Sequence, residues 1–254
     1  MIAGIIPARY ASTRFPGKPL VQIEGKSMIR RVYEQALKSR SLDKVVVATD
    51  DERIARHVRD FGGEAIITAS HHPSGTDRCA EVLQKLGDAY RYVINIQGDE
   101  PFIDPGQIDT LASVLKDGVT EIATLIIQVD DKDVLFDVGE VKVVLNPKME
   151  ALYFSRSVIP FFKDVPEREW HLRRAYYRHV GMYAYRADIL RQITKLPVSS
   201  LEKAESLEQL RWVEAGYKVK CAVTHHDSHC IDTPEDIPKV LQMMEKARRL
   251  SGKN

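Results

Sequence analysis

The sequence predicts an α/β protein built on a mainly parallel sheet. Short apolar runs rich in Ile and Val, at Ile2–Ile6, Lys44–Thr49 and Tyr92–Ile96, are typical of strands buried on both faces of such a sheet. Helical patterns separate these runs, and strands that alternate with helices in short units indicate parallel pairing. With 254 residues, we expect a single domain over 1–254.

The first strand leads into a cationic loop. From Arg9 to Lys18 the loop carries Arg9, Arg14 and Lys18, small residues such as Ser12, and no acid. Small residues let backbone N–H groups approach phosphate oxygens, and Arg and Lys form charge-assisted bonds to them. The position after strand one is also where such sheets bind ligands. We therefore predict a triphosphate site, but neither a Walker A loop, since Pro19 follows Lys18, nor a G-x-G-x-x-G fingerprint.

Two helices and a third strand come next. Ser27 is a plausible N-cap for a helix over Met28–Ser39. Gly62-Gly63 closes a second helix over Glu52–Phe61, because glycine tolerates the positive φ of a helix end. Glu64–Thr68 is expected to be a strand.

A Ser-Gly-Thr turn at Ser74, Gly75 and Thr76 then precedes a helix that contains Arg78 and runs to about Leu86. Ser74 or Thr76 can cap this helix. A turn of this kind at a helix N-terminus suits an anion or a polar base, although it is also a common plain cap.

A second group of candidate functional residues follows the strand at 92–96, at its carboxyl end. Gly98 lets the backbone turn closely against a ligand, and Asp99 presents a carboxylate there. Pro101 keeps Glu100 out of the helical region and fixes the turn. We expect Asp99 to be functional and leave the role of Glu100 open.

The second half of the chain has a looser pattern. Strands are expected over 121–129, 140–145, 179–185 and 217–223, with a helix over 206–212. Between Asn146 and Arg178 the periodicity is weak and seven aromatic residues are crowded together, which suggests an interface or a pocket wall. They are Tyr153, Phe154, Phe161, Phe162, Trp170, Tyr176 and Tyr177.

The last part of the chain contains a cluster of His residues and a candidate metal carboxylate. Residues 225–230 hold three His, but in an extended segment these point to different faces, so we favour a hairpin over a metal site. Asp232 directly precedes a final helix, which runs to about Leu250. Thr233 as N-cap, Pro234 at N1 and Asp236 at N3 resemble a capping box.

Composition excludes several classes of protein. The net charge is +1, from 37 Lys and Arg against 36 Asp and Glu, which argues against a general nucleic-acid binder. The three cysteines, unevenly spaced, indicate neither a disulfide framework nor a zinc site. No apolar run approaches the roughly 18 residues of a membrane span, and no signal segment precedes the first strand. We expect a soluble, cytoplasmic protein.

Asp99 and Asp232, each fixed by a stiff turn, are a candidate Mg²⁺ site if the fold brings them together. Mg²⁺ takes few protein oxygens and completes its octahedron with water and phosphate. A metal on one side and Arg9, Arg14 and Lys18 on the other suit nucleotidyl transfer, in which charge develops on phosphate oxygens. No Ser-His-Asp or Cys-His pairing is visible, so the nucleophile is expected to be a substrate hydroxyl.

Three motifs, in this order along the chain, carry a resemblance to a known family: IPARYASTRFPGKPL at 6–20, SGTDR at 74–78 and GDEPF at 98–102. With them the chain resembles the 3-deoxy-manno-octulosonate cytidylyltransferases, or CMP-KDO synthetases, from Ile2 to about Ile237. The resemblance implies a three-layer, Rossmann-like nucleotide-diphospho-sugar transferase fold with a mixed, mainly parallel sheet. It also implies a homodimer, with a dimerisation subregion within about 130–178.

The same resemblance implies the reaction and its residues. CMP passes from CTP to the anomeric hydroxyl of KDO, with Mg²⁺ as cofactor, which activates KDO for lipopolysaccharide biosynthesis. Arg9, Lys18, Asp99 and Asp232 would be catalytic, the two carboxylates as metal ligands. The residues expected to bind CTP are Arg9, Ser12, Arg14, Lys18, Ser74, Gly75, Arg78 and Gln97. Those expected to bind the sugar acid are Gln97, Arg156, His179, Tyr183, Glu208 and Gln209.

Three alternatives remain. A cytidylyltransferase for a related sugar acid, 8-amino-KDO or a sialic acid, would have the same triphosphate site. A metal-dependent glycosyltransferase is disfavoured because Asp99-Glu100-Pro101 is not D-x-D. A catalytically silent nucleotide-binding protein would be expected to lack the carboxylates or the loop cations. The number of metal ions and the order of substrate binding stay open.

Overall fold

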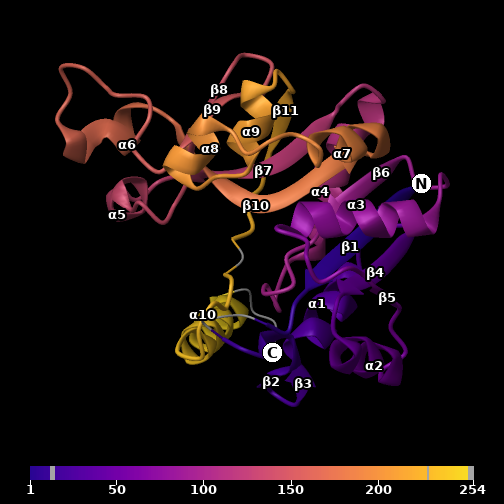
Figure 1. Cartoon of the computed structure of the whole chain (residues 1–254). Coiled ribbons are helices and arrows are strands. Elements are labelled where there is room, and N and C mark those ends of the chain that lie inside the picture. The colour runs from indigo at the N-terminus through magenta and orange to yellow at the C-terminus, as the bar shows by residue number, and fades with distance from the viewer. Residues whose placement is uncertain (12–14, 228, 251–254) are drawn as a thin grey trace.

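A central sheet with helices on both faces forms the body of the protein (Figure 1). The computed structural model describes residues 1–11, 15–227 and 229–250; of residues 244 and 246–250 only the helical backbone is described. In these ranges nine strands form the main sheet. Seven of them follow the order β11 (Val219–Val223), β7 (Ile122–Val129), β10 (Tyr176–Arg186), β6 (Tyr92–Asn95), β1 (Ile2–Ala8), β4 (Lys44–Thr49) and β5 (Ala65–Ile67).

The sheet is mixed because one long strand runs against its neighbours. β10 is antiparallel to both β6 and β7, whereas the β6–β1–β4–β5 pairs and the β7–β11 pair are parallel. The hairpin of β8 (Lys142–Leu145) and β9 (Ala151–Ser155) extends the sheet beside β10. The predicted mixed, mainly parallel α/β fold is therefore confirmed.

Helices cover both faces, which explains why the strands are apolar throughout. One face packs against α1 (Met28–Ala36), α2 (Glu52–Asp60) and α4 (Pro105–Val114). The other packs against α3 (Gly75–Leu86), α7 (Ala187–Ile193), α8 (Ser200–Glu205) and α9 (Gln209–Glu214). Along β1, Ile5 and Ile6 point into opposite core layers and both are fully buried.

Side chains at the helix starts supply the caps that the sequence suggested. The Ser27 hydroxyl accepts the Arg30 N–H at the start of α1, and the Ser74 hydroxyl accepts the Asp77 N–H at the start of α3. The first helix is shorter than predicted, since α1 ends at Ala36.

A side lobe projects from the body beyond β8 and β9 (Figure 1). Its short helices are α5 (Lys132–Phe136) and α6 (Trp170–Arg173), and the 3-10 turn η3 (Glu167–Glu169) precedes α6. Trp170 and Tyr176 are buried against Val129 and Leu135 in a small core of their own. The stretch 146–178 is thus more ordered than its weak periodicity predicted, with β9 and α6 inside it.

The seven aromatic residues of this stretch are mostly covered within the chain. Phe154, Trp170 and Tyr176 are buried, and of the seven only Phe161 is exposed, at 73%. Most of these aromatic residues therefore pack within the chain, and Phe162, Trp170 and Tyr176 belong to the core of the lobe itself.

The C-terminal helix α10 (Asp236–Leu250) returns to the opposite end of the molecule, beside the hairpin of β2 (Gln22–Ile23) and β3 (Lys26–Ser27) (Figure 1). Ile231 and Val240 pack there with Ile23 and Met28. A segment described over residues 224–227 and 229–235, called the strap below, lies between β11 and this helix in the chain. Among the helices described, none combines the length and the hydrophobicity that a membrane span requires.

Candidate functional site

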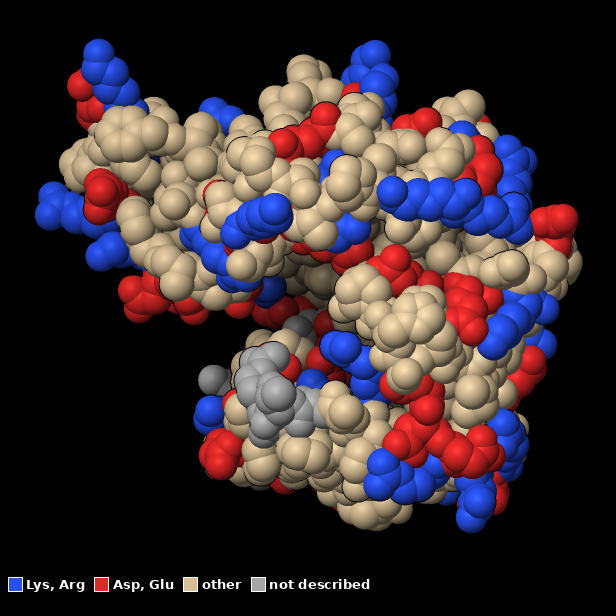
Figure 2. All heavy atoms as spheres, viewed as in Figure 1, with Lys and Arg blue, Asp and Glu red and all other residues tan. Residues whose placement is uncertain are grey.

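A cavity of about 450 Å³ lies where β1 and β6 end and α3 begins. Figure 2 shows a hollow between the two halves of the molecule, with basic and acidic side chains close together on its walls. The cavity is lined by Pro7, Ala8, Arg9, Ala11, Lys18, Pro19, Ser74, Gly75, Arg78, Gln97, Gly98, Asp99 and Asp232. The structure thus brings together the cationic loop, the α3 turn and both predicted metal carboxylates.

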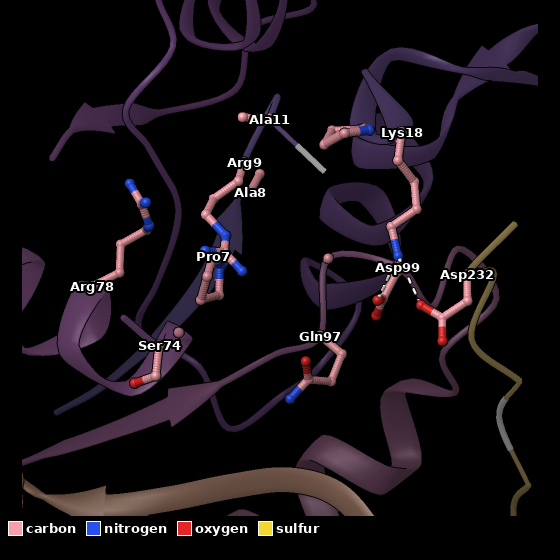
Figure 3. A pocket seen from close by; sticks show the side chains of 13 residues that line it. Pro7, Ala8, Arg9, Ala11, Lys18, Ser74, Arg78, Gln97, Asp99 and Asp232 are labelled. Carbon is pink, nitrogen blue, oxygen red and sulfur yellow. Dashed lines mark hydrogen bonds and ion pairs between the residues drawn. The ribbon is translucent and has the colours of Figure 1, made fainter. Parts of the chain in front are cut away.

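Lys18 lies between the two carboxylates (Figure 3). Its Nζ is 2.8 Å from Oδ2 of Asp99 and 3.3 Å from Oδ1 of Asp232. Lys18 begins the 3-10 turn η1 (Lys18–Leu20) directly after Gly17, whose φ of 72° favours glycine. Asp99 follows β6, and Asp232 lies in the strap. Although Asp99 is 81 positions and Asp232 is 214 positions away from Lys18 in the sequence, both carboxylates contact its ammonium group.

The backbone fixes both carboxylates. A Cβ atom on Gly98 would lie 2.6 Å from the Pro7 carbonyl oxygen, so only glycine lets the loop of Asp99 pass this close to the end of β1. The Ile231 N–H donates to the Asp99 carbonyl oxygen at 2.9 Å, which joins the two carboxylate segments directly.

Asp236 shapes the turn that presents Asp232. Its Oδ2 accepts the backbone N–H groups of Asp232 at 3.1 Å and Thr233 at 2.9 Å. The Thr233 N–H above all lowers the pKa of Asp236 to about 2, so the carboxylate stays ionised near neutral pH. The helix begins at Asp236 rather than at Thr233, and the Thr233 hydroxyl donates to Asp236 instead of capping the backbone, so only half of the predicted capping box forms.

Arg78 and Ser74 line the opposite side of the cavity, with Arg9 between them and the Lys18 cluster (Figure 3). Arg78 is only 1% exposed. Its Nη1 donates to the Thr68 hydroxyl and lies 3.4 Å from Asp50, while its Nη2 has no hydrogen-bond partner among the described residues. Burial lowers the pKa of this guanidinium, and a buried cation with an uncommitted donor is a natural anion or base contact.

Sequence reasoning missed Asp50 and Thr68, which hold Arg78. They follow β4 and β5, and nothing in the local pattern connects them with a residue on α3. Strand order alone provides the signal, since both lie at the carboxyl edge where ligands bind. The predicted CTP contacts Ser12 and Arg14 lie outside the described residues.

Apart from Gln97, the predicted sugar-binding residues do not line this cavity; they lie on β10, at the start of α9 and just after β9. Gln97 connects the two regions, since it lines the cavity and its amide donates to the Gly181 carbonyl. Gly181 lies where a bulge interrupts the β10–β7 register, between Val180 and Tyr183. Gln209 is buried at the first position of α9.

His179 and Tyr183 are neighbours on β10, with ring centroids 5.1 Å apart. Burial lowers the pKa of His179 to about 3, so the imidazole is neutral, and its Nε2 lies 2.9 Å from the Thr124 hydroxyl. Burial raises the pKa of Tyr183, although a hydrogen bond with the Thr124 side chain opposes this effect.

Arg156 follows β9 at the edge of the side lobe. Its Nε donates to the Glu205 carbonyl oxygen at 2.8 Å and its Nη1 to the Val138 carbonyl at 3.1 Å. Glu205 also accepts the Arg156 N–H at 2.9 Å and the Ser155 hydroxyl at 2.7 Å. Glu205, which the sequence did not single out, therefore fixes the orientation of this arginine.

Polar contacts hold the His-rich part of the strap against the protein. Nδ1 of His226 lies 3.3 Å from Asp104, and the His226 carbonyl accepts the Gln107 amide at 2.8 Å. Asp227 pairs with Arg178 of β10. These contacts anchor the segment that carries Asp232.

Known proteins match this chain over nearly its whole length. Residues 3–221 match the family model described as cytidylyltransferase. A 3-deoxy-manno-octulosonate cytidylyltransferase from Parabacteroides distasonis is 54% identical over 95% of this chain and 97% of its own. This chain belongs to the 3-deoxy-manno-octulosonate cytidylyltransferase family.

Solved structures agree with that assignment. A CMP:2-keto-3-deoxy-manno-octonic acid synthetase complexed with CTP is 42% identical, covers 97% of this chain and 99% of its own, and superposes with a TM-score of 0.89. The 4-diphosphocytidyl-2C-methyl-D-erythritol synthase of Anaerococcus prevotii shares only 13% identity, over 96% of this chain and 98% of its own, but has the same fold at a TM-score of 0.63. The predicted nucleotide-diphospho-sugar transferase fold is confirmed.

Proposed function

We propose that this protein transfers CMP from CTP to the anomeric hydroxyl of KDO, giving CMP-KDO and pyrophosphate. The observation that carries this proposal is the cavity in which Asp99 and Asp232 meet Lys18, in a chain that belongs to the KDO cytidylyltransferase family. The new bond joins the KDO oxygen to the α-phosphorus of CTP. The bond to pyrophosphate breaks, and the KDO hydroxyl gives up its proton.

The nucleotide side of the cavity suits a triphosphate. Arg9, Lys18 and Arg78 all line it, and together they can compensate much of the charge of CTP and of departing pyrophosphate. Ser74 and Gly75, at the start of α3, offer a hydroxyl and a backbone without a side chain where a base or ribose can approach.

Asp99 and Asp232 fit a Mg²⁺ ion. Both present hard carboxylate oxygens to one point, and the Lys18 ammonium lies there as a cation between them. Mg²⁺ binds through few protein oxygens and completes its coordination with water and phosphate, so two carboxylates are enough to hold it beside a nucleotide. When bound, the ion would neutralise phosphate charge and ease loss of the KDO proton.

The sugar acid is expected to bind on the β10 side, reached past Gln97. Arg156 can pair with its carboxylate, and Tyr183 and Gln209 can bond to its hydroxyls. A role in lipopolysaccharide biosynthesis and a cytoplasmic location follow from this proposal. The three cysteines are free, which suits a reducing compartment.

The test is pyrophosphate release with CTP, Mg²⁺ and a panel of sugar acids. We expect the highest kcat/KM with KDO, and weaker use of 8-amino-KDO and sialic acids. A clear preference for another sugar acid would identify the rival cytidylyltransferase, and release with none of them would contradict the proposal.

Lys18→Ala should impair use of CTP more than Lys26→Ala. Lys18 lies in the cavity, whereas Lys26 pairs with Glu34 at 2.6 Å outside it. A charge-assisted bond to phosphate contributes about 1.5–3 kcal/mol, so kcat/KM for CTP should fall roughly 10- to 100-fold in Lys18→Ala. Equal losses in the two variants would mean that the loop acts only as a diffuse positive patch.

We also propose that the protein is a homodimer formed through the side lobe. The exposed Phe161 ring packs edge-on against Trp170, and Leu172 of α6 is likewise 73% exposed, so this lobe leaves apolar surface uncovered in one chain. Light scattering on dilution should show a dimer for the wild type and for Val119→Glu, an exposed control, but a monomer for Phe161→Glu. A wild-type monomer at micromolar concentration with full activity would overturn this proposal.

A further inference from the structure

Glu208 lies between the nucleotide side and the sugar side of the site. It occupies the turn between α8 and α9, just after Ser206, whose φ is 54°. Its Oε1 lies 3.1 Å from the Ser74 hydroxyl, and its Oε2 lies 3.1 Å from the Thr76 hydroxyl. The first turn of α3, which is predicted to bind CTP, thus contacts Glu208, which is predicted to bind the sugar acid.

The Ser74 hydroxyl has too few hydrogens to donate to both Asp77 and an ionised Glu208. A serine hydroxyl has one hydrogen to donate and two lone pairs that accept. The Ser74 Oγ already accepts the Asp77 N–H at 3.2 Å. Its single hydrogen is best placed toward Oδ2 of Asp77, at 2.6 Å, rather than toward Glu208 at 3.1 Å. The contact between Ser74 and Glu208 then needs a proton from Glu208.

We infer that Glu208 is a neutral carboxylic acid in the ligand-free protein, donating its proton from Oε1 to Ser74 and accepting the Thr76 hydroxyl at Oε2. Burial independently favours the same state, because it raises the pKa of Glu208 above that of a free glutamic acid.

The charged neighbours of Glu208 act in opposite directions. Arg211 of α9 lowers the pKa of Glu208, but burial outweighs this effect, and the Arg211 guanidinium forms two bonds to Glu202, at 2.8 and 2.6 Å. Asp77 on α3 adds a like charge that opposes ionisation. The other titratable groups that face Glu208 are Cys79 of α3 and Tyr183 and Tyr185 of β10. Burial raises the pKa of all three, so they are uncharged.

A neutral Glu208 fits an anionic substrate, and this step rests on the proposed function. Two carboxylates in a partly desolvated site repel one another, whereas a carboxylic acid can donate a hydrogen bond to the substrate. His179 and Tyr183 are neutral too, so the wall offers hydrogen bonds without negative charge. Glu208 would therefore favour sugar acids as a class while avoiding like-charge repulsion.

The protonation state can be measured without any substrate. In infrared difference spectra of the ligand-free protein near neutral pH, Glu208→Gln should remove a protonated carboxylic acid band. Glu34→Gln is the matched control, because hydrogen bonds from Lys26 and Arg30 lower the pKa of Glu34, and it should remove an ionised carboxylate band. Loss of an ionised band in Glu208→Gln, with circular dichroism like that of the wild type, would overturn the inference whatever the reaction is.

A second measurement tests the link to the substrate. In the wild type, KM for KDO should rise with pH once Glu208 ionises, by up to about tenfold per pH unit. In Glu208→Gln, KM for KDO should not rise over the same pH range, whatever its absolute value. Thr76→Val removes a donor that stabilises the ionised form, so the rise should move to higher pH. A protonated band with the same pH profile in all three proteins would leave the protonation state standing and overturn the role in binding the sugar acid.

Discussion

The contact of one ammonium group with two carboxylates organises this molecule. Asp99 and Asp232 repel each other when both are ionised, and the Lys18 Nζ between them, at 2.8 and 3.3 Å, offsets that repulsion. One positive charge against two negative ones still leaves the cluster anionic. The divalent cation that we propose for this site would bring a second positive charge, and Lys18 would then be free to meet the phosphates of a nucleotide.

Bringing these three groups together constrains the rest of the fold. Parallel β1 and β6 are neighbours, so the loops after them meet at one edge, and Gly98 lets them pass in close contact. The strap must cross from β11 to the opposite end of the molecule to deliver Asp232. Two contacts hold the strap in place. His226 and Asp227 pair with charged residues of the body, and α10 packs on the β2–β3 hairpin. The last helix therefore lies far from β11, and the strap between them carries Asp232 to the cavity.

Much of this could be predicted from the sequence, because local patterns carried it. Strand periodicity predicted the parallel strands, and charge together with turn chemistry predicted that Lys18, Asp99 and Asp232 would share a site. The side lobe was missed because its core forms between residues whose spacing has no helical or strand period, such as Val129 and Trp170. The contact between Ser74 and Glu208, 134 residues apart, likewise has no local signal. The start of α10 was misplaced because Thr233 directs its hydroxyl to the Asp236 side chain rather than to the backbone.

The most direct test of the charge cluster is a crystal structure with CTP and Mn²⁺, in which anomalous scattering locates the metal. We predict a peak between Asp99 and Asp232, with the Lys18 ammonium turned toward the phosphates, and no such peak in Asp232→Asn. A metal bound away from both carboxylates, with Lys18 still bridging them, would contradict this account of the site.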